Sequence, residues 1–495
     1  MKTLNLVTAR RNMVDDKGLL LEKISDAFDT AAMASNVWHL PAELHRQILQ
    51  YVDHDTMLQY RIASKYLCAI ATEELFSTLT FHHSTWSVER LIEISKIPHI
   101  RTHIKTIIWD TSHWQIPNVR TFWEWKLYLL RKGGFYRGQN SGMKAYGDVL
   151  VKLAESQDDW EAYLDKVKDE KAAKNIFFQS DVFSQFPNLH TIHVSDGVEH
   201  QKPDAQSLCR GEGWNGWNNR SGLKAFQWLQ KMSPLPIKTL RLDKLSHFGL
   251  QYVSGDFSSL TSLDLHITAR MDSFYFNPWD HTEWWSPALI MPRGYLRKFI
   301  TGMPHLHTLQ INLRDTARGD YWRGRQPLTS VDAVFGPEYT WPKLRHLSLR
   351  HFFATPDTLF SLLSRHRATL RHLSLCNIFF DDDCMQSAGD NPHWFTDWPQ
   401  SRHGWQEIIY KRLHLGEWPA FLQAVSETLR LQRATVSGGL ATHRFGMGWF
   451  LGSKRSSSDD RELGAAVSQY LVSGGVCPLN DDNVLLLHHW DDYRA

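Results

Sequence analysis

The chain has 495 residues, of which 42% are hydrophobic and 22% are charged, as in globular rather than disordered proteins. Its net charge of +2 excludes a strongly basic protein, so we expect no nucleic-acid partner. The five cysteines are scattered without a CxxC pair, which argues against a disulfide framework and a zinc site. We find no signal peptide and no apolar run of the roughly 20 residues that span a bilayer. The sequence therefore predicts a protein of the cytoplasm or nucleus, without a membrane partner.

Three short helices are predicted near the N-terminus. Pro41 suits the first turn of a helix, where its missing N–H costs nothing. Asp53 is a good N-cap residue for a second helix, whose apolar face would carry Leu58 and Ile62. A third helix is expected after Ser64. Because three short helices enclose little core, such a module should pack on the next part of the chain or on a partner.

The same residues resemble the F-box over residues 37–82. The matching positions, in order, are Leu40, Pro41, Glu43, Leu44, Ile48, Leu49, Asp55, Leu58, Arg61, Ala63, Ser64, Lys65, Leu75 and Phe76. Ala63 departs from the pattern, because a larger aliphatic residue is commoner there. The resemblance implies docking on the Skp-type adaptor of a cullin-RING ligase, mainly through Leu40, Pro41, Leu44, Ile48 and Leu49. The alternative is that these residues are only the internal core of a helical domain.

A second pattern, LxxLxL, recurs downstream and predicts strands that are buried on one side. It occurs at Ile104-Ile107-Trp109, Leu189-Ile192-Val194, Ile237-Leu240-Leu242, Leu260-Leu263-Leu265, Leu306-Leu309-Ile311, Leu344-Leu347-Leu349 and Leu370-Leu373-Leu375. The phrase resembles the strand segment of a leucine-rich repeat. Two intervals, 237–260 and 344–370, have the length of such repeats, and the longer ones imply insertions. The alternative is a set of unrelated strands in an α+β domain.

One repeat is complete, because a helix is predicted between its strands. Thr355 can cap that helix and Pro356 suits its first position. The repeat family prefers Asn or Cys at the ninth position, but this chain has other residues there, for example Ile378. We therefore expect a degenerate solenoid without an asparagine ladder.

The longest insertion, residues 120–180, predicts further helices. Trp123, Leu127 and Leu130 would form the apolar face of the first of them. A last helix is expected from Ser457 to Tyr470. The whole chain resembles the large fungal type of F-box protein, in which such a C-terminal region caps the repeats.

No motif points to an enzyme. Gly211, Gly213 and Gly216 spell GxGxxG, but neither a strand before them nor a helix after them is predicted, so no dinucleotide site is expected. His488 and Asp491 are more typical of a solvated tail than of a metal site. We therefore expect no cofactor, no metal and no catalytic residue.

The predicted fold class is α/β, a short all-α F-box followed by an irregular leucine-rich-repeat-like solenoid with helical insertions. The predicted parts are a tail at 1–36, the F-box at 37–82, the irregular repeat domain at 83–395 with its helical insertion at 120–180, and a capping region at 396–495. The resemblance implies the substrate-recognition subunit of an SCF-type (Skp-cullin-F-box) E3 ubiquitin ligase that binds an unknown protein target. The alternatives are a non-degradative interaction scaffold with an F-box-like module, and an enzyme whose site is built from the insertions.

Tryptophan is abundant, with 21 residues, and aromatic anchors commonly dominate interface energy. Most of these rings are interpreted as core filler. Those in two loop-like stretches are candidate contacts for the protein target, namely Trp214, Trp217, Trp279, Trp284 and Trp285. Packing between loops is the equally weighted alternative for them.

Overall fold

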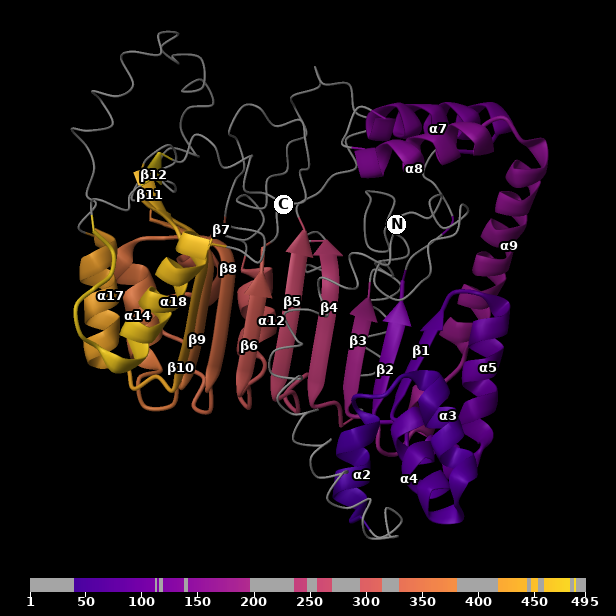
Figure 1. The fold of residues 1–495 in the computed structure, drawn as a ribbon, viewed down its shortest axis with the longest axis horizontal. Helices are drawn as coiled ribbons and strands as arrows, with labels where there is room; N and C mark the ends of the chain where they lie inside the picture. The colour runs from indigo at the N-terminus through magenta and orange to yellow at the C-terminus, as the bar shows by residue number, and fades with distance from the viewer. Residues whose placement is uncertain are drawn as a thin grey trace, which may run out of the picture. The chain divides into compact units, whose positions relative to one another are not determined.

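The structure, a computed structural model, describes residues 40–111, 114, 119–137, 141–195, 236–246, 256–268, 294–313, 329–380, 417–442, 447–452, 458–480 and 485–486. The chain divides into two compact units, residues 1–78 and 79–495. Figure 1 shows the helices and strands of each unit. No helix in these ranges is long and apolar enough to cross a lipid bilayer.

The first unit contains the three predicted helices, α2 (Ala42–Leu49), α3 (His54–Ala63) and α4 (Lys65–Leu75). Pro41 directly precedes α2. The Oδ1 atom of Asp53 accepts a hydrogen bond of 2.8 Å from the backbone N–H of Thr56 and caps α3. Ser64 caps α4 in the same way through the N–H of Leu67, at 3.1 Å. Each such cap stabilises its helix by about 1 kcal/mol.

A small core joins the three helices. Leu49 of α2 is fully buried against Ile70 and Ala71 of α4, and Met57 and Tyr60 of α3 pack on this group. So few apolar side chains can stabilise the unit only modestly, as expected for a module of this size.

The predicted apolar face of α3 is not the face that packs in the core of the unit. Leu58 and Ile62 lie on the exposed side of the helix, with 38% and 78% of their surface accessible. Met57 and Tyr60 face the core instead. Both pairs have helical spacing, so the pattern alone does not tell which pair is buried.

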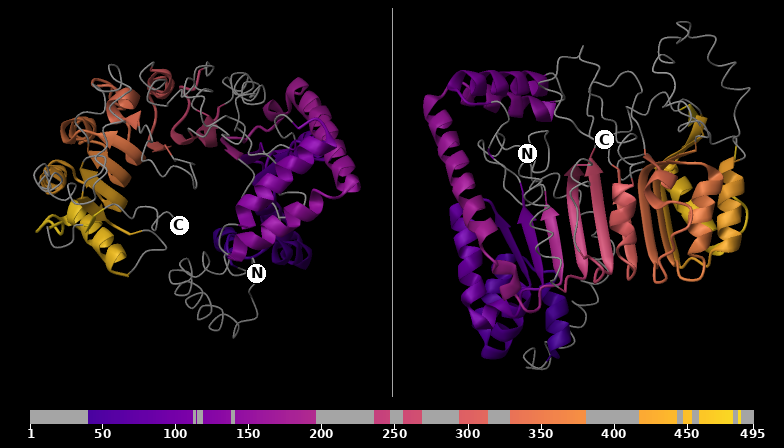
Figure 2. Two further views of the ribbon diagram at one scale, coloured as in Figure 1. Left: turned by 90° about the horizontal axis from the view of Figure 1, so that it is seen from above. Right: turned by 180° about the vertical axis from the view of Figure 1, so that it is seen from behind.

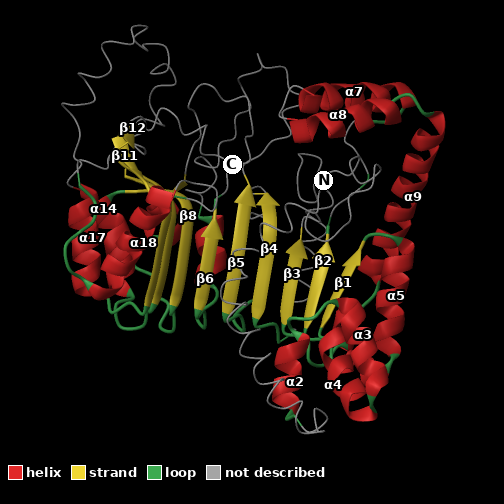
Figure 3. Cartoon of the chain, in the orientation of Figure 1, coloured by secondary structure: helices red, strands yellow, loops and turns green. Residues whose placement is uncertain are grey.

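In the second unit, the described residues form one sheet of twelve strands (Figure 3). The strands are β1 (Thr78–His82), β2 (Thr106–Asp110), β3 (Thr191–Ser195), β4 (Thr239–Ser246), β5 (Ser262–Thr268), β6 (Thr308–Asn312), β7 (Thr329–Ser330), β8 (His346–Ala354), β9 (His372–Phe380), β10 (Arg433–Thr442), β11 (Met447–Phe450) and β12 (Leu485–Leu486). The strands from β2 to β10 pair in parallel, with the short β7 beside the end of β8. Strands β11 and β12 continue the sheet antiparallel. Since helices connect the parallel strands, the chain is an α/β protein with a single, mainly parallel sheet.

All seven predicted strands are present, and they are neighbours in chain order. The register aligns their apolar positions in two rows. The first row contains Ile107, Ile192, Leu240, Leu263, Leu309, Leu347 and Leu373. The second row contains Trp109, Val194, Leu242, Leu265, Ile311, Leu349 and Leu375. Every one of these side chains is buried in the same core, because successive side chains of a strand alternate between the two faces of a sheet.

A repeated hydrogen-bond pattern fixes this register at the start of each strand. The carbonyl oxygen of Lys105 accepts hydrogen bonds from the N–H groups of both His190 and Thr191, each at 3.1 Å. The carbonyl oxygen of Arg371 accepts two in the same way, from Gln432 and Arg433. Each strand pair between these two carries the same double hydrogen bond, through the carbonyls of His190, Lys238, Thr261, His307 and Arg345.

Helices of the second unit cover the apolar face of the sheet. They are α5 (Thr85–Lys96), α6 (Pro98–Arg101), α9 (Gln157–Gln179), η2 (Val182–Gln185), α12 (Tyr295–Thr301), α13 (Val331–Phe335), α14 (Pro356–Arg365), α17 (Glu417–Thr428) and α18 (Ser458–Ser473). Figure 2, left, shows α12, α14 and α17 on one side of the strands. The buried leucines of α14, for example Leu359 and Leu363, lie in the same core as those of the strands. The polar side chains between the strand leucines therefore belong to the opposite face, called the open face below.

The predicted helix of the complete repeat is confirmed as α14. Its N-cap is Thr355, whose Oγ1 accepts a hydrogen bond of 3.1 Å from the N–H of Thr358, and Pro356 occupies the first turn. The hydroxyl of Thr358 in turn accepts from the N–H of Thr355, which completes a capping box. The last predicted helix is also present, as α18.

The insertion contains helices α7 (Phe122–Arg137), α8 (Ser141–Leu153) and the first part of α9. They form a core of their own that includes Trp125, Leu129, Leu150 and Trp160. The first predicted helix is therefore correct, and Leu130 of its predicted face packs on this core, but Trp123 is exposed while Trp125 is buried.

Most described tryptophans are core residues, as interpreted. Trp109, Trp125, Trp341, Trp418 and Trp449 are fully buried.

Strand β10 was missed. Its apolar positions Ala434 and Val436 align with Leu373 and Leu375 of β9, and the buried Leu431 precedes the strand. The small side chain of Ala434 hid the pattern, since LxxLxL requires a large apolar residue at that position.

A single asparagine, Asn377, connects neighbouring strands one position before the ninth position of its repeat. The Oδ1 atom of Asn377 accepts a hydrogen bond of 2.7 Å from the N–H of Gly439, and its Nδ2 atom donates to His351 Nε2 at 3.0 Å. Asn377 and His351 both have positive φ angles, of 53° and 63°. The strands β8, β9 and β10 thus share a kink that these side chains stabilise.

Candidate functional site

The predicted adaptor-binding residues lie on or beside α2. Pro41 and Leu44 are exposed, and Ile48 and Leu40 are half-buried. Pro41, Leu44 and Ile48 are three or four residues apart, so they share one side of the helix. Leu49 is different, because it is fully buried in the core of the unit. It therefore supports the fold and does not belong to the surface.

The first unit exposes further large apolar side chains. Besides Leu44, with 43% of its surface accessible, these are Leu58, Ile62, Tyr51 and Tyr66. Exposed apolar groups of this kind mark surfaces that another molecule covers.

The side chain of His45 is fully buried, and no sequence pattern singled it out. Its Nδ1 atom is hydrogen-bonded to the hydroxyl of Tyr60. Burial lowers the pKa of His45, so the ring is neutral near pH 7. The pair joins α2 to α3 and has a structural role.

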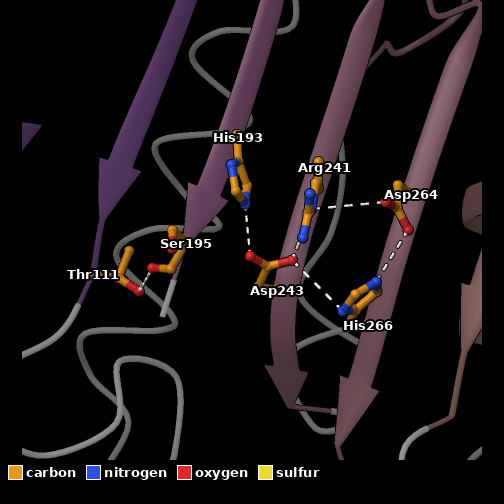
Figure 4. Close-up of polar contacts among 7 residues, drawn as sticks. All are labelled: Thr111, His193, Ser195, Arg241, Asp243, Asp264 and His266. Atoms are coloured by element: carbon orange, nitrogen blue, oxygen red, sulfur yellow. Dashed lines mark hydrogen bonds and ion pairs between the residues drawn. The ribbon is translucent and has the colours of Figure 1, made fainter. Parts of the chain in front are cut away.

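In the second unit, a network of charged side chains lies on the open face of β3, β4 and β5 (Figure 4). His193 Nε2 lies 2.6 Å from Asp243 Oδ2, and Arg241 Nε lies 3.0 Å from Asp243 Oδ1. Since a carboxylate only accepts hydrogen bonds, both nitrogens are donors. Asp264 lies 3.7 Å from Arg241 Nε and 3.3 Å from His266 Nε2. Every carboxylate in this network therefore has cationic or donor partners.

The strand register explains how these residues meet. His193, Arg241 and Asp264 are directly opposite one another in β3, β4 and β5. Asp243 is two residues beyond Arg241, on the same face of β4. Burial alone would raise the pKa of Asp243, but the hydrogen bond and charge of His193, together with Arg241, outweigh it and hold the pKa below its ordinary value.

A hollow of about 420 Å³ continues the open face from β5 to β10. The polar and charged side chains of its lining include Asp264, Asn312, His346, Arg350, His372 and Arg433. The hollow shares Asp264 with the network but differs from it in two ways. Its arginines, Arg350 and Arg433, outnumber its one carboxylate, and neither arginine pairs with a carboxylate of the described residues.

Three of the lining residues form a row. His346, His372 and Arg433 are directly opposite one another in β8, β9 and β10. The two imidazole rings have their centroids 5.7 Å apart. Burial, together with the neighbouring His372 and Arg433, lowers the pKa of His346.

The hollow was not predicted from the sequence. A histidine on the polar side of a strand such as LRHLSL is by default a surface residue with partners of its own. That holds for His193, which is paired, but His346 and His372 line the hollow. One sequence signal could have revealed the hollow, namely the residue before the second apolar position of each LxxLxL phrase. This residue is Thr or Ser in β2–β6 and changes to His, His and Arg in β8, β9 and β10.

The predicted target-binding tryptophans, Trp214, Trp217, Trp279, Trp284 and Trp285, lie outside the described residues. The same is true of the GxGxxG stretch and of His488 and Asp491. Across the part of the chain that is described, no three His, Cys, Asp or Glu side chains are placed to hold a metal ion.

Compared with known proteins, the chain matches no protein family and no curated protein.

Proposed function

We propose that this chain is the substrate-recognition subunit of an SCF-type E3 ubiquitin ligase, with the first unit acting as an F-box that docks on a Skp-type adaptor. The observation that carries the proposal is the exposed apolar surface of a small three-helix unit. Leu44 and Ile62 are accessible to solvent although the unit has few apolar side chains to spare for its core. A partner surface would remove them from water at about 25 cal/mol per Å².

We further propose that the second unit is an irregular leucine-rich-repeat solenoid. The support is the regular register of the LxxLxL strands and the double hydrogen bond at the start of each strand pair. The interval from β8 through α14 to β9 has the strand–helix–strand order of one such repeat.

In this proposal the chain carries no chemistry of its own. The adaptor would connect it to a cullin-RING ligase, and the open face of the sheet would hold a protein target. Transfer of ubiquitin to the target would then be accelerated by proximity, because two bound reactants react as one molecule. The complex would act in the cytoplasm or nucleus.

Reconstitution tests the proposal. The purified full chain is mixed with a Skp-type adaptor, a cullin and its RING subunit, and the complex is isolated by size-exclusion chromatography. A stable complex that ubiquitinates proteins captured by the chain supports the proposed function. A stable complex without ubiquitination would instead favour the non-degradative scaffold, and the absence of any complex would overturn both.

A further inference from the structure

The charges of the open face are balanced on one half and unbalanced on the other. Across β3–β5, Asp243 and Asp264 are paired with His193, Arg241 and His266. Across β8–β10, the guanidinium groups of Arg350 and Arg433 have no acceptor within the described residues. A ligand for the second half should therefore bring negative charge.

A buried acceptor lies at the same place. Asn312 is 8% exposed and lines the hollow, and in the described structure its Oδ1 atom accepts no hydrogen bond. Leaving a buried polar atom unpaired is costly, so a ligand that supplies an N–H or O–H donor here is favoured. Asn312 is directly opposite Arg350 in the sheet, so the donor and the negative charge would be neighbours in the ligand.

The strand geometry gives the length of the site. His346 and Arg350 are four residues apart on the same face of β8, which at 3.3 Å per residue places them about 13 Å apart. An extended peptide of similar rise matches this distance with two side chains four residues apart. Its backbone also supplies N–H groups from which Asn312 Oδ1 can accept a hydrogen bond.

From these observations we infer that the hollow binds an extended segment of a protein target that carries two oxyanion groups four residues apart. One group lies on the row of His346, His372 and Arg433, and the other lies on Arg350. The oxyanions are carboxylates of Asp or Glu or phosphates of modified Ser or Thr, since both accept the forked hydrogen bonds of arginine. The inference rests on the proposed function for its assumption that the ligand is a protein.

Fluorescence anisotropy on the full chain tests the inference. The probe is a fluorescein-labelled peptide, Gly-Glu-Gly-Ser-Gly-Glu-Gly amide. A second peptide carries phosphoserine in place of both Glu residues, and a third carries Gln. The glutamate or the phosphoserine peptide should bind at least about tenfold more tightly than the glutamine peptide, the usual scale of a lost charge-assisted hydrogen bond. The tighter of the two identifies the oxyanion.

Two variants of equal charge locate the site. R350Q/R433Q should weaken binding of the acidic peptide by about tenfold or more. R367Q/R430Q removes the same two charges from exposed positions of the neighbouring turns, outside the hollow, and should leave binding within about twofold. Equal weakening by both pairs would show non-specific attraction and overturn the inference, as would equal binding of all three peptides.

Two further measurements separate the inference from other accounts. Single-stranded oligothymidylate is tested as a competitor of the acidic peptide. If it binds through Arg350 and Arg433 more tightly than the peptide does, the assignment of the ligand to a protein segment is overturned. Adaptor binding is measured on the same preparation. A chain that binds the adaptor but none of the peptides contradicts this inference alone, whereas a chain that binds the acidic peptide but not the adaptor contradicts the proposed function alone.

Discussion

His193 Nε2 donates a hydrogen bond of 2.6 Å to Asp243 Oδ2, although fifty positions separate the two residues in the chain. The contact exists because β3 and β4 are neighbours in parallel register. It is nearly sheltered from water, since the side chains are 11% and 10% exposed. Interactions of charges in such surroundings are stronger than on an open surface.

We predict that Asp243→Asn destabilises the second unit by about 2 kcal/mol at pH 7, because it removes the buried charge that His193 and Arg241 share. The pKa of Asp243 is lower in the folded chain than its ordinary value of 3.8. Its stabilisation is therefore fully present above pH 3.8 and is lost as the pH falls through the lowered pKa. Urea unfolding followed by circular dichroism should show a difference between variant and wild type that persists down to pH 4 and narrows below it.

The control for this prediction is Asp165→Asn, whose carboxylate forms an exposed pair with Lys168. It should change stability by less than about 0.5 kcal/mol. A similar loss in both variants would show that Asp243 contributes only to the net charge.

The row of His346, His372 and Arg433 predicts that acidic peptides bind more tightly as the pH falls. Burial, together with the neighbouring His372 and Arg433, lowers the pKa of His346 in the free chain. A bound oxyanion favours the protonated ring and raises that pKa, so binding takes up a proton. Affinity for the glutamate peptide should rise between pH 8 and pH 5.5, by up to about tenfold for each unit by which the pKa changes.

Anisotropy titrations across this pH range check the linkage, because the glutamates of the peptide stay ionised above about pH 5.5. His346→Gln should flatten the profile while retaining the contribution of Arg350. A profile that keeps its slope in His346→Gln would show that the proton is not taken up by His346 and would contradict the prediction.

Leu49 and Leu44 lie in the same helix but should respond differently to truncation. Leu49→Ala leaves a cavity in a small core and should destabilise the first unit by about 3 kcal/mol. Leu44→Ala removes a side chain that is 43% exposed and should change stability by less than about 0.5 kcal/mol. Hydrogen exchange of the full chain should show faster exchange over residues 42–75 in the first variant only. Equal protection in the two variants would mean that Leu49 does not hold the helices together.

Gly438 should tolerate alanine less well than Gly474, although both have φ near +70°. A Cβ atom at Gly438 would lie 2.2 Å from Asn377 Oδ1, whereas one at Gly474 would meet no atom of the described structure within 4 Å. The backbone strain is common to both sites. The additional destabilisation of Gly438→Ala over Gly474→Ala, about 2 kcal/mol, therefore measures the clash with Asn377. Equal losses in thermal unfolding would show that Asn377 moves aside freely.

The apolar rows of the sheet were predictable, because leucine, isoleucine and valine that alternate with polar residues indicate a strand that is buried on one side. The network of His193 and Asp243 was not. The LxxLxL phrase aligns the leucines of successive strands, but it does not specify which polar side chains between them form hydrogen bonds across the strands.

Helix faces show a similar limit. Met57 and Tyr60 satisfy helical spacing as well as Leu58 and Ile62 do, and only packing against α4 decides which pair is buried. Strand β10 was missed for a different reason. Ala434 is small, yet the register of β10 with β9 places it in line with the leucines.

Binding of the full chain to a purified Skp-type adaptor tests the central claim most directly. The wild type is compared with Pro41→Ala/Leu44→Ala, which truncates two exposed side chains of the first unit, and with Val472→Ala/Val476→Ala, which truncates two exposed valines of the second unit. We predict that the wild type and the valine variant co-purify with the adaptor. The Pro41→Ala/Leu44→Ala variant should lose binding by about tenfold or more while its helices stay protected from hydrogen exchange. A wild-type chain that does not bind the adaptor, or a Pro41→Ala/Leu44→Ala variant that binds it as well as the wild type, would contradict the account.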